Sequence, residues 1–346
     1  MTDRSVIVLE LAHDSGHLPP GRHKGSGVIM KAAVIDTLGT APRVTAHPDP
    51  SPATGNLVLL KVEAAALNAI DLHVASGHHR AGPPRLPYVP AMEAVGTIIA
   101  GPDQGLRVRA FAAAGLVPGA NGGMAELLLT DRAACVPVPE GLDSAAAAAI
   151  GIVGTSADLS LRKAGIQAGD SVLVLGATGP LGTAVLQLAR LAGAKRVIAA
   201  GRNPERLAQL SPAADGVVLL GDEPLPGQLA NLGGPVDLVV DSVWGPWAGQ
   251  ALGCLQPGGR YLNVGAAGGD GTDFHVEWLR AAQLTLIGFS AARAEPADVI
   301  ASYQHIASLA AAGSLELPTA TYSLDEATQA WEAQASSPGK KIVVIP

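Results

Sequence analysis

Three glycines in one short segment provide the strongest chemical signal in the sequence. Gly176, Gly179 and Gly182 follow the apolar run Ser171–Leu175 and precede a segment with apolar residues at helical spacing. The first two glycines let the chain turn sharply and let a phosphate approach bare backbone, while Gly182 lets a helix pack close to the preceding strand. A helix starting near Leu181 would point its free N–H groups at that phosphate. The spacing therefore predicts a nucleotide site between a strand and a helix.

The end of the next apolar run indicates which nucleotide this site would take. A site for NAD usually carries an acidic residue here, which holds the ribose 2′-hydroxyl. This chain instead has Gly201, Arg202 and Asn203, followed by Arg206. A carboxylate would repel a 2′-phosphate, whereas a guanidinium pairs with it bidentately. We therefore predict NADP(H) as the cofactor; the alternative is that both arginines only solvate the start of a helix.

Composition limits the classes of protein to which the chain can belong. With 346 residues, 48% of them hydrophobic and 15% charged, it is long enough for two globular domains. The net charge of −7 argues against nucleic acid as a main partner, since phosphate binding needs a basic face. The sequence has no apolar run long enough to cross a bilayer, so no membrane partner is expected. Cys135 and Cys254 are its only cysteines, which fits a reduced, cytoplasmic setting.

The order of the expected elements divides the chain into domains. Residues 1–29 are expected to form a flexible N-terminal extension. From residue 30 to about 150, short β runs alternate with Pro- and Gly-rich loops. Strands and helices then alternate, with a turn at Pro257–Gly259 before a strand from Tyr261, which predicts an α/β fold with a doubly wound parallel sheet. The terminal run Lys340–Ile345 would be a strand that rejoins the β-rich part.

This order and a set of motifs resemble the medium-chain dehydrogenase/reductases, and within them the zinc-less quinone oxidoreductase branch. The resemblance covers nearly the whole chain after Met30. The matching pieces are Leu67–Asp71, Met92-Glu93 with Gly96, Gly122–Glu126, Pro137–Gly141, Ala168–Asp170, the glycine turn and Gly339–Val344. The resemblance implies a Rossmann NADP-binding domain at residues 151–289, inserted in a GroES-like catalytic domain of residues 30–150 and 290–346.

The resemblance also bears on metal binding. Zinc-dependent relatives have zinc ligands at two positions where this chain has Asn68 and Met92, although Glu93 remains. The cysteine cluster that holds a structural zinc in those relatives is missing as well. Neither an amide nor a thioether is a usual ligand of catalytic zinc. We therefore expect that the protein binds no metal.

Without a Lewis acid, the resemblance implies hydride transfer from NADPH to a small electron-poor acceptor, a quinone or a carbonyl-conjugated alkene. His73 is the candidate proton donor, because a histidine titrates close to neutral pH. Alternatively, His73 hydrogen-bonds a neighbour or the ribose, and water supplies the proton. Asn68 could orient the carbonyl of the acceptor or the amide of the nicotinamide; alternatively its amide only fixes a loop.

Strand ends and the resemblance together complete the set of residues expected at the cofactor, since ligands of such folds bind beyond the carboxyl ends of the strands. Ser156 lies where relatives place a threonine beside the nicotinamide. Several of these residues could instead be ordinary loop or core positions. The full set is Ser156, Gly176, Thr178, Gly179, Pro180, Leu181, Gly182, Arg202, Asn203, Arg206, Ser242, Val264, Gly265, Ala266 and Phe289.

Some positions depart from the pattern of the family, notably Ala91, where relatives have a glycine, and these departures leave the substrate open. Two other functions therefore compete with a quinone or alkene reductase. One is a metal-free alcohol or carbonyl oxidoreductase in a biosynthetic pathway, and the other is a non-catalytic protein that binds NADPH, as in lens crystallins of this branch. Relatives pair by joining sheet edges, so we expect a homodimer through the apolar strand Leu284–Gly288.

Overall fold

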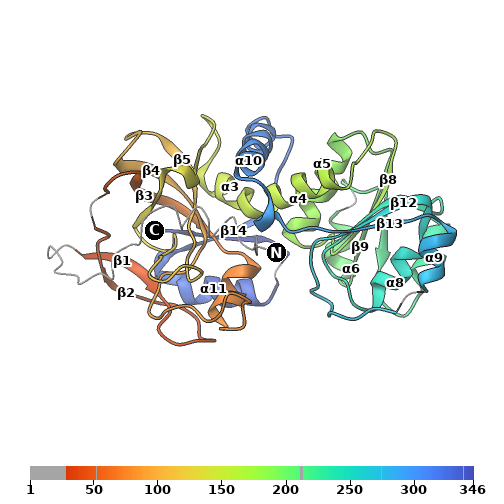
Figure 1. Ribbon diagram of the computed structural model, residues 1–346, viewed down its shortest axis with the longest axis horizontal. Coiled ribbons are helices and arrows are strands. Elements are labelled where there is room, and N and C mark those ends of the chain that lie inside the picture. Colours follow the sequence, from red (N-terminus) through yellow and green to blue (C-terminus); the bar gives the residue numbers. More distant parts are fainter. Residues whose placement is uncertain (1–28, 52, 211–212, 274, 338) are drawn as a thin grey trace, which may run out of the picture. The chain divides into compact units, whose positions relative to one another are not determined.

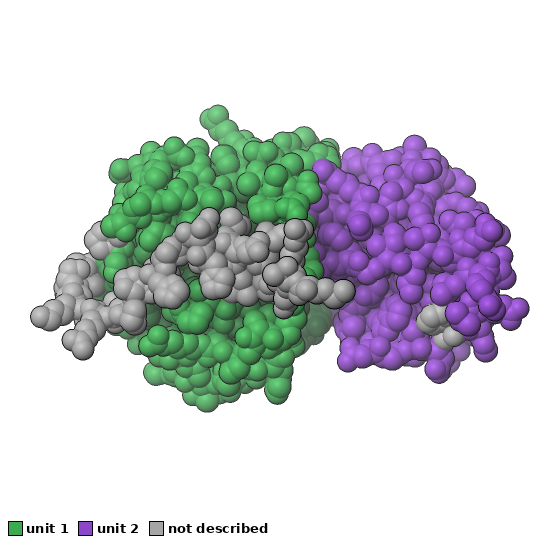
Figure 2. Space-filling model, in the orientation of Figure 1, with its two compact units in different colours: residues 1–152, 292–346 green, residues 153–291 purple. Residues whose placement is uncertain are grey.

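The computed structural model describes residues 29–51, 53–210, 213–273, 275–337 and 339–346 (Figure 1). The expected N-terminal extension, residues 1–29, therefore lies outside the described residues except for Ile29. The described chain forms two compact units, coloured separately in Figure 2. The first unit contains the residues up to Ile152 together with Ala292–Pro346, and the second contains Val153–Ala291.

The second unit is built on a six-stranded sheet in which all neighbouring strands are parallel (Figure 1). Its strands, in the order they have across the sheet, are β10 (Gly216–Leu219), β9 (Arg196–Gly201), β8 (Ser171–Leu175), β11 (Val236–Asp241), β12 (Leu255–Asn263) and β13 (Thr285–Gly288). The direction of strand addition reverses between β8 and β11, and ligands of doubly wound folds bind at this reversal. The predicted doubly wound parallel sheet is confirmed.

One helix precedes the first strand of this sheet, and further helices connect its successive strands. They are α4 (Gly151–Lys163), whose first two residues belong to the first unit, α5 (Pro180–Leu191), α6 (Pro204–Ala208), α7 (Leu225–Ala230), α8 (Pro246–Leu252) and α9 (Val276–Ala281). A proline stands at the start of α5, α6, α7 and α8. Proline suits this place because the first N–H groups of a helix have no partner within the helix. All five residues of β8 are buried, which explains its unbroken run of Val and Leu.

One turn expected from the sequence is instead part of a strand. Pro257–Gly259 lies inside β12, which runs from Leu255 to Asn263. The register of β12 against β11 shifts between Leu255 and Arg260, so the intervening residues form a bulge. Gly258 has a φ of +78°, a conformation that glycine adopts without steric strain. The turn prediction was wrong because a bulge and a turn use the same residue types.

The first unit contains a seven-stranded sheet and a two-stranded ribbon. Across the larger sheet the order is β14-β15-β3-β4-β5-β7, with β6 paired to β3, and β1 pairs with β2 in the ribbon. The strands are β1 (Ile29–Val34), β2 (Arg43–Pro48), β3 (Leu57–Ala66), β4 (Glu93–Ala100), β5 (Arg107–Phe111), β6 (Leu127–Asp131), β7 (Cys135–Pro137), β14 (Thr319–Ser323) and β15 (Lys341–Ile345). The C-terminal strand β15 pairs with β3, as the sequence suggested.

The helices of the first unit are α2 (Ala69–Ala75), α3 (Ser144–Ala149), α10 (Pro296–Ala311) and α11 (Ala327–Ala335). Short 3₁₀ turns occur at Arg132–Ala134 and Leu324–Glu326, and a third, Ala291–Arg293, lies at the boundary where the first unit resumes. None of the helices in the described part of the chain combines the length and apolar character needed to span a bilayer. Because β15, β3 and β4 are sheet neighbours, three polar residues at their ends come together: Lys341 begins β15, Asn68 follows β3 and Glu93 begins β4.

Candidate functional site

The glycine turn after β8 is shaped by close contacts between backbone atoms. Gly176 has a φ of +81°, and its N–H and that of Ala177 both donate to Ala200 O at 3.0 Å. A Cβ on Gly182 would lie 2.3 Å from Gly176 O, so only glycine fits where α5 leaves the turn. A Cβ on Gly179 would meet only Gly176 O, at 3.5 Å. The turn is open at Gly179, so the backbone at the N-terminus of α5 is accessible to a phosphate group there.

The residues predicted to hold a 2′-phosphate lie at the end of β9. Arg202 and Asn203 are exposed, and Arg206 is half-buried on α6. Asn203 Oδ1 accepts from Arg206 N at 2.8 Å, so Asn203 is the N-cap of α6. A Cβ on Gly201 would lie 3.0 Å from Thr178 Cγ2. The fold therefore brings Thr178 of the glycine turn next to the strand end that carries Arg202.

Three further loops lie at the carboxyl ends of the neighbouring strands β11, β12 and β13. Ser242 follows β11, and its Oγ donates to Leu175 O at 3.2 Å. A Cβ on Gly176 would lie 2.4 Å from that Oγ, so Ser242 packs directly against the glycine turn. The predicted residues Val264, Gly265 and Ala266 follow β12, and Phe289 follows β13. The structure thus collects all predicted cofactor residues except Ser156 on the loops and helix starts at one edge of the sheet.

The helix α4 carries a hydroxyl that sequence reasoning missed. Ser156, which was expected beside the nicotinamide, is half-buried. Its neighbour Thr155 is 4% exposed, and its Oγ1 has no hydrogen-bond partner among the described residues. A buried hydroxyl without a hydrogen-bond partner is unfavourable unless a ligand or water satisfies it. Thr155 is therefore a second candidate for the hydroxyl expected beside the nicotinamide. The sequence could not distinguish the two, because burial on a helix depends on tertiary packing.

Lys341 is a buried cation in the first unit. Its side chain is enclosed where β15, β3 and β4 meet, and only 1% of the residue is exposed. The Nζ donates to Leu67 O at 2.8 Å, to Asn68 Oδ1, and to Glu93 Oε1 at 3.2 Å. Burial lowers the pKa of Lys341, and the Glu93 carboxylate opposes that shift. The ammonium thus joins three oxygen acceptors from two strand ends.

The amide of Asn68 is oriented by this lysine. An ammonium only donates, so Asn68 must turn its Oδ1 towards Lys341. The Asn68 Nδ2 then donates to Glu93 Oε1 at 2.8 Å and to Ala66 O at 3.3 Å. Asn68 is also the N-cap of α2. Both amide hydrogens are directed at protein atoms, which favours the interpretation that Asn68 fixes a loop over one in which it donates to a substrate carbonyl.

Glu93 completes the cluster through its other oxygen. Oε2 accepts from Ile152 N at 2.6 Å and from Arg109 Nη2 at 3.2 Å. The residue is 0% exposed, and a Cβ on Gly151 would lie 1.9 Å from Oε2, so glycine is needed where α4 begins. The carboxylate therefore bridges two buried cations and the first turn of α4. A buried carboxylate is tolerated when it is paired in this way.

Asp71 ties together Asn68 and Met92, the two residues expected at the positions of zinc ligands. Its Oδ1 accepts from Met92 N at 2.9 Å and its Oδ2 from Asn68 N at 2.8 Å. Burial raises the pKa of Asp71 to about 7. The described residues contain no group of three or more His, Cys, Asp or Glu side chains suited to a metal ion. That the protein works without zinc stays a prediction from Asn68 and Met92.

His73 lies on the last turn of α2 and is exposed. Its ring lies edge to face with that of His79, with ring centres 5.5 Å apart. His79 Nδ1 accepts from Ala81 N at 3.2 Å, so a neutral His79 carries its proton on Nε2. Burial, and then the charge of His73, lower the pKa of His79. The role of His73 as proton donor stays a prediction.

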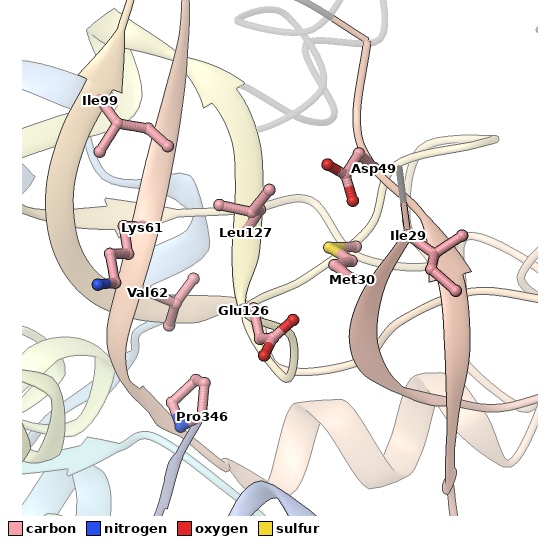
Figure 3. Close-up of a pocket in the computed structure, with 9 residues that line it drawn as sticks. All are labelled: Ile29, Met30, Asp49, Lys61, Val62, Ile99, Glu126, Leu127 and Pro346. Atoms are coloured by element: carbon pink, nitrogen blue, oxygen red, sulfur yellow. The ribbon is translucent and has the colours of Figure 1, made fainter. Parts of the chain in front are cut away.

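A hollow on the first unit lies apart from these residues. It has a volume of about 310 Å³ and is formed mainly by β1, β3, β4 and β6 (Figure 3). Its lining combines apolar side chains with three charged ones, Asp49, Lys61 and Glu126. The Glu126 carboxylate is engaged, since its Oε2 accepts from Lys31 N at 2.7 Å. Neither Asn68 nor His73 lines this hollow, so it does not belong to the candidate site.

Each unit contains one of the two cysteines. Cys135 begins β7 in the first unit, and Cys254 precedes β12 in the second. Both are free and buried, and burial raises the pKa of each thiol to about 12. The nucleophilic form of cysteine is the thiolate. Neither cysteine is therefore part of the candidate chemistry.

Two models of protein families match the chain. A zinc-binding dehydrogenase model matches residues 180–308, and an alcohol dehydrogenase GroES-like domain model matches residues 54–140. A zinc-type alcohol dehydrogenase-like protein of Schizosaccharomyces pombe is 32% identical over 248 residues, which cover 70% of this chain and 71% of that protein. A quinone oxidoreductase of Rattus norvegicus is 29% identical over 300 residues, or 82% of this chain and 86% of that protein.

Solved structures with the same fold support these matches. The quinone oxidoreductase from Thermus thermophilus, also solved in complex with NADPH, has a TM-score of 0.74 and 31% sequence identity, and covers 92% of this chain and 100% of that one. A mycobacterial quinone oxidoreductase has a TM-score of 0.80 and 25% identity, with the same coverage. The similarity extends over both units of the chain.

Proposed function

Because the chain belongs to the medium-chain dehydrogenase/reductase superfamily, as a quinone-oxidoreductase-like member, we propose that it is an NADPH-dependent, zinc-independent oxidoreductase that reduces a quinone or a carbonyl-conjugated C=C bond. The observation that carries the proposal is the open glycine turn beside a strand end that has Arg202 where NAD sites have a carboxylate. When bound, NADPH would supply the hydride. Its pyrophosphate would lie on Gly176–Gly182.

The remaining roles fall to three side chains. Arg202 would pair with the 2′-phosphate, since it is exposed at the end of β9. His73 would return the proton that reduction of the acceptor requires, because its side chain is exposed and an imidazole can act as a general acid. Lys341 would orient the Asn68 amide and pair with Glu93, and so hold the end of β3 in place. We propose a cytoplasmic location because both cysteines are free.

Oxidation of NADPH by a panel of acceptors tests this function. We expect the purified protein to oxidise NADPH with quinones and enones, followed by the loss of NADPH absorbance, and to prefer NADPH over NADH by about tenfold or more. Turnover with aldehydes or alcohols alone would favour the metal-free alcohol or carbonyl oxidoreductase. Binding of NADPH without turnover by any acceptor would favour the non-catalytic binding protein.

The variant Arg202→Ala is the cofactor control in the same experiment. It should weaken NADPH binding by about tenfold and leave NADH binding nearly unchanged, because only NADPH carries the 2′-phosphate. Arg280→Ala is a matched variant, since Arg280 is also exposed in the second unit but lies on α9. Equal loss of both cofactors in Arg202→Ala would contradict the proposed 2′-phosphate site.

We further propose that the protein forms a homodimer through β13. This strand lies at one edge of the sheet and pairs only with β12 among the described strands. Leu286 on β13 is 43% exposed, and Trp278 on the preceding helix is 41% exposed. On the opposite edge strand β10, the Gln228 side chain occupies the N–H and the carbonyl of Leu219, at 3.0 and 2.9 Å. An uncovered apolar edge favours pairing with a second copy.

Light scattering at micromolar concentration should therefore give the mass of a dimer. Leu286→Lys should yield a folded monomer, since a charge on an edge strand opposes pairing. Leu219→Lys is its matched control, because Leu219 is equally exposed, at 43%, on the opposite edge strand. A monomeric wild type, or a monomer produced by Leu219→Lys and not by Leu286→Lys, would rule out this interface.

A further inference from the structure

The loop after β11 is fixed to the sheet by one buried carboxylate. Asp241 is the last residue of β11 and is 0% exposed. Its Oδ1 accepts from Val243 N at 2.7 Å and from Trp244 N at 2.9 Å, and its Oδ2 accepts from Trp244 N at 3.0 Å and from Tyr261 Oη at 2.6 Å. Burial raises the pKa of Asp241, while these hydrogen bonds oppose the shift. The carboxylate thus connects the loop to β12, on which Tyr261 lies.

The backbone of this loop is strained. Trp244 has a φ of +55°, a conformation that residues with a side chain rarely adopt. Gly245 follows with a φ of +66°, and a Cβ there would lie 2.4 Å from Gly268 O. Such strain persists only where surrounding contacts determine the conformation. The N–H groups held by Asp241, together with the bond of 3.0 Å from Trp244 Nε1 to Asp270 O, provide those contacts.

The same loop lies between the glycine turn and the loop after β12. On one side, Ser242 contacts Gly176 and donates to Leu175 O. On the other side, Gly268 N donates to Val243 O at 2.6 Å, and a Cβ on Gly265 would lie 3.0 Å from Ser242 O. Three loops from neighbouring strands are therefore stacked, and Asp241 holds the middle one.

We propose that Asp241 is a positioning residue of the cofactor site: its carboxylate sets the affinity for NADP(H) by holding residues 242–244 against the glycine turn, although its own atoms are fully buried. The inference rests on the proposed cofactor. The proposal predicts that a substitution at Asp241 weakens NADP(H) binding because residues 242–244 become less ordered. A change that only lowers the stability of the same strand should leave binding intact.

The test uses Asp241→Asn, which keeps the size of the side chain. In either orientation the NH₂ group of the new asparagine faces a backbone N–H of Val243 or Trp244. A backbone N–H can only donate a hydrogen bond, whereas the Tyr261 hydroxyl can also accept one. We expect the Kd for NADPH to rise about fivefold or more, measured by calorimetry. Hydrogen exchange of residues 242–249, measured without cofactor, should also become about tenfold faster.

Asp237→Asn is the matched control on the same strand. Asp237 lies near the opposite end of β11, where its carboxylate accepts from Ser171 N at 2.7 Å. This variant should change the Kd by less than about twofold. If Asp241→Asn does not fold, Tyr261→Phe replaces it, with an expected rise of about threefold in Kd, since one of the donors is lost.

The outcomes separate this inference from the proposed function. Unchanged affinity and unchanged exchange in a folded Asp241→Asn or Tyr261→Phe variant would overturn the positioning role, as would equal losses in Asp237→Asn. A wild type that fails to bind NADPH would overturn the proposed cofactor instead. In that case the exchange of residues 242–249 still reports whether Asp241 orders the loop, because that measurement contains no cofactor.

Discussion

Replacing Glu93 by methionine should lower the free energy of unfolding by about 3–5 kcal/mol, because it leaves Lys341 and Arg109 as unpaired buried cations. Both are almost fully buried, with side-chain exposures of 2% and 4%. The variant also removes the acceptor of Ile152 N at the start of α4. Urea unfolding followed by circular dichroism measures the loss. A loss below about 1 kcal/mol would mean that water already reaches the cluster.

Two further variants separate charge pairing from packing. The double variant Glu93→Met/Lys341→Met removes one buried charge of each sign, so it should be more stable than Glu93→Met by about 1 kcal/mol or more. Lys340→Met is the surface control, since Lys340 is exposed next to Lys341 and should change stability by less than about 0.5 kcal/mol. Strictly additive losses would contradict mutual neutralisation of Glu93 and Lys341.

Gly182→Ala should abolish cofactor binding and lower the free energy of unfolding by about 1–3 kcal/mol, because the added Cβ overpacks a backbone contact. The atoms it would meet are Gly176 O at 2.3 Å and Ala177 Cα at 2.6 Å. Both belong to the main chain, so neither can move aside as the end of a flexible side chain would. Unfolding and NADPH titration, run on the same preparation, measure the two effects.

Gly179→Ala is the matched variant in the same turn. Its Cβ would meet only Gly176 O, at 3.5 Å, and its φ of −91° suits alanine. Stability should therefore stay within about 0.5 kcal/mol of the wild type. NADPH affinity should nevertheless fall by about tenfold, since the methyl group occupies the open side of the turn. Unchanged affinity would show that the phosphates do not approach Gly179.

The glycine turn could be predicted because its causes are local. A strand that is buried on both faces is an unbroken apolar run, and a close approach of two backbones requires glycine wherever it occurs. Both features lie within Ser171–Gly182 and can be seen without knowledge of any distant contact. The doubly wound sheet followed from the same local patterns, repeated along the chain. The role of the turn in binding a cofactor stays a prediction.

The buried charge cluster could not be predicted because its partners are far apart in the sequence. Lys341 and Glu93 are separated by 248 residues, and two adjacent lysines give no sign that one is buried and the other exposed. The sequence therefore singled out Asn68 without the lysine that orients its amide. Thr155 was missed for a similar reason, since only tertiary packing distinguishes its hydroxyl from that of Ser156.

Ala91 departs from the pattern of the family, and only the structure shows the backbone conformation at this position. The resemblance to the family led us to expect a glycine where this chain has an alanine. The backbone there has a φ of +74°, in the region that favours glycine, and the residue is 0% exposed. The chain therefore keeps the conformation of a glycine at a position that precedes Met92 and Glu93, and alanine bears steric strain there.

Because each unit contains one buried cysteine, the reactivity of the two thiols reports how often each unit opens. Cys135 and Cys254 lie in different units, and both thiols are buried and protonated at neutral pH. A thiol reagent can reach each one only when the surrounding unit opens, so the labelling rate of each cysteine measures the opening of its own unit. A ligand that stabilises one unit slows labelling there alone. The two units can thus be followed separately in solution by thiol labelling of the native chain, without an engineered cysteine.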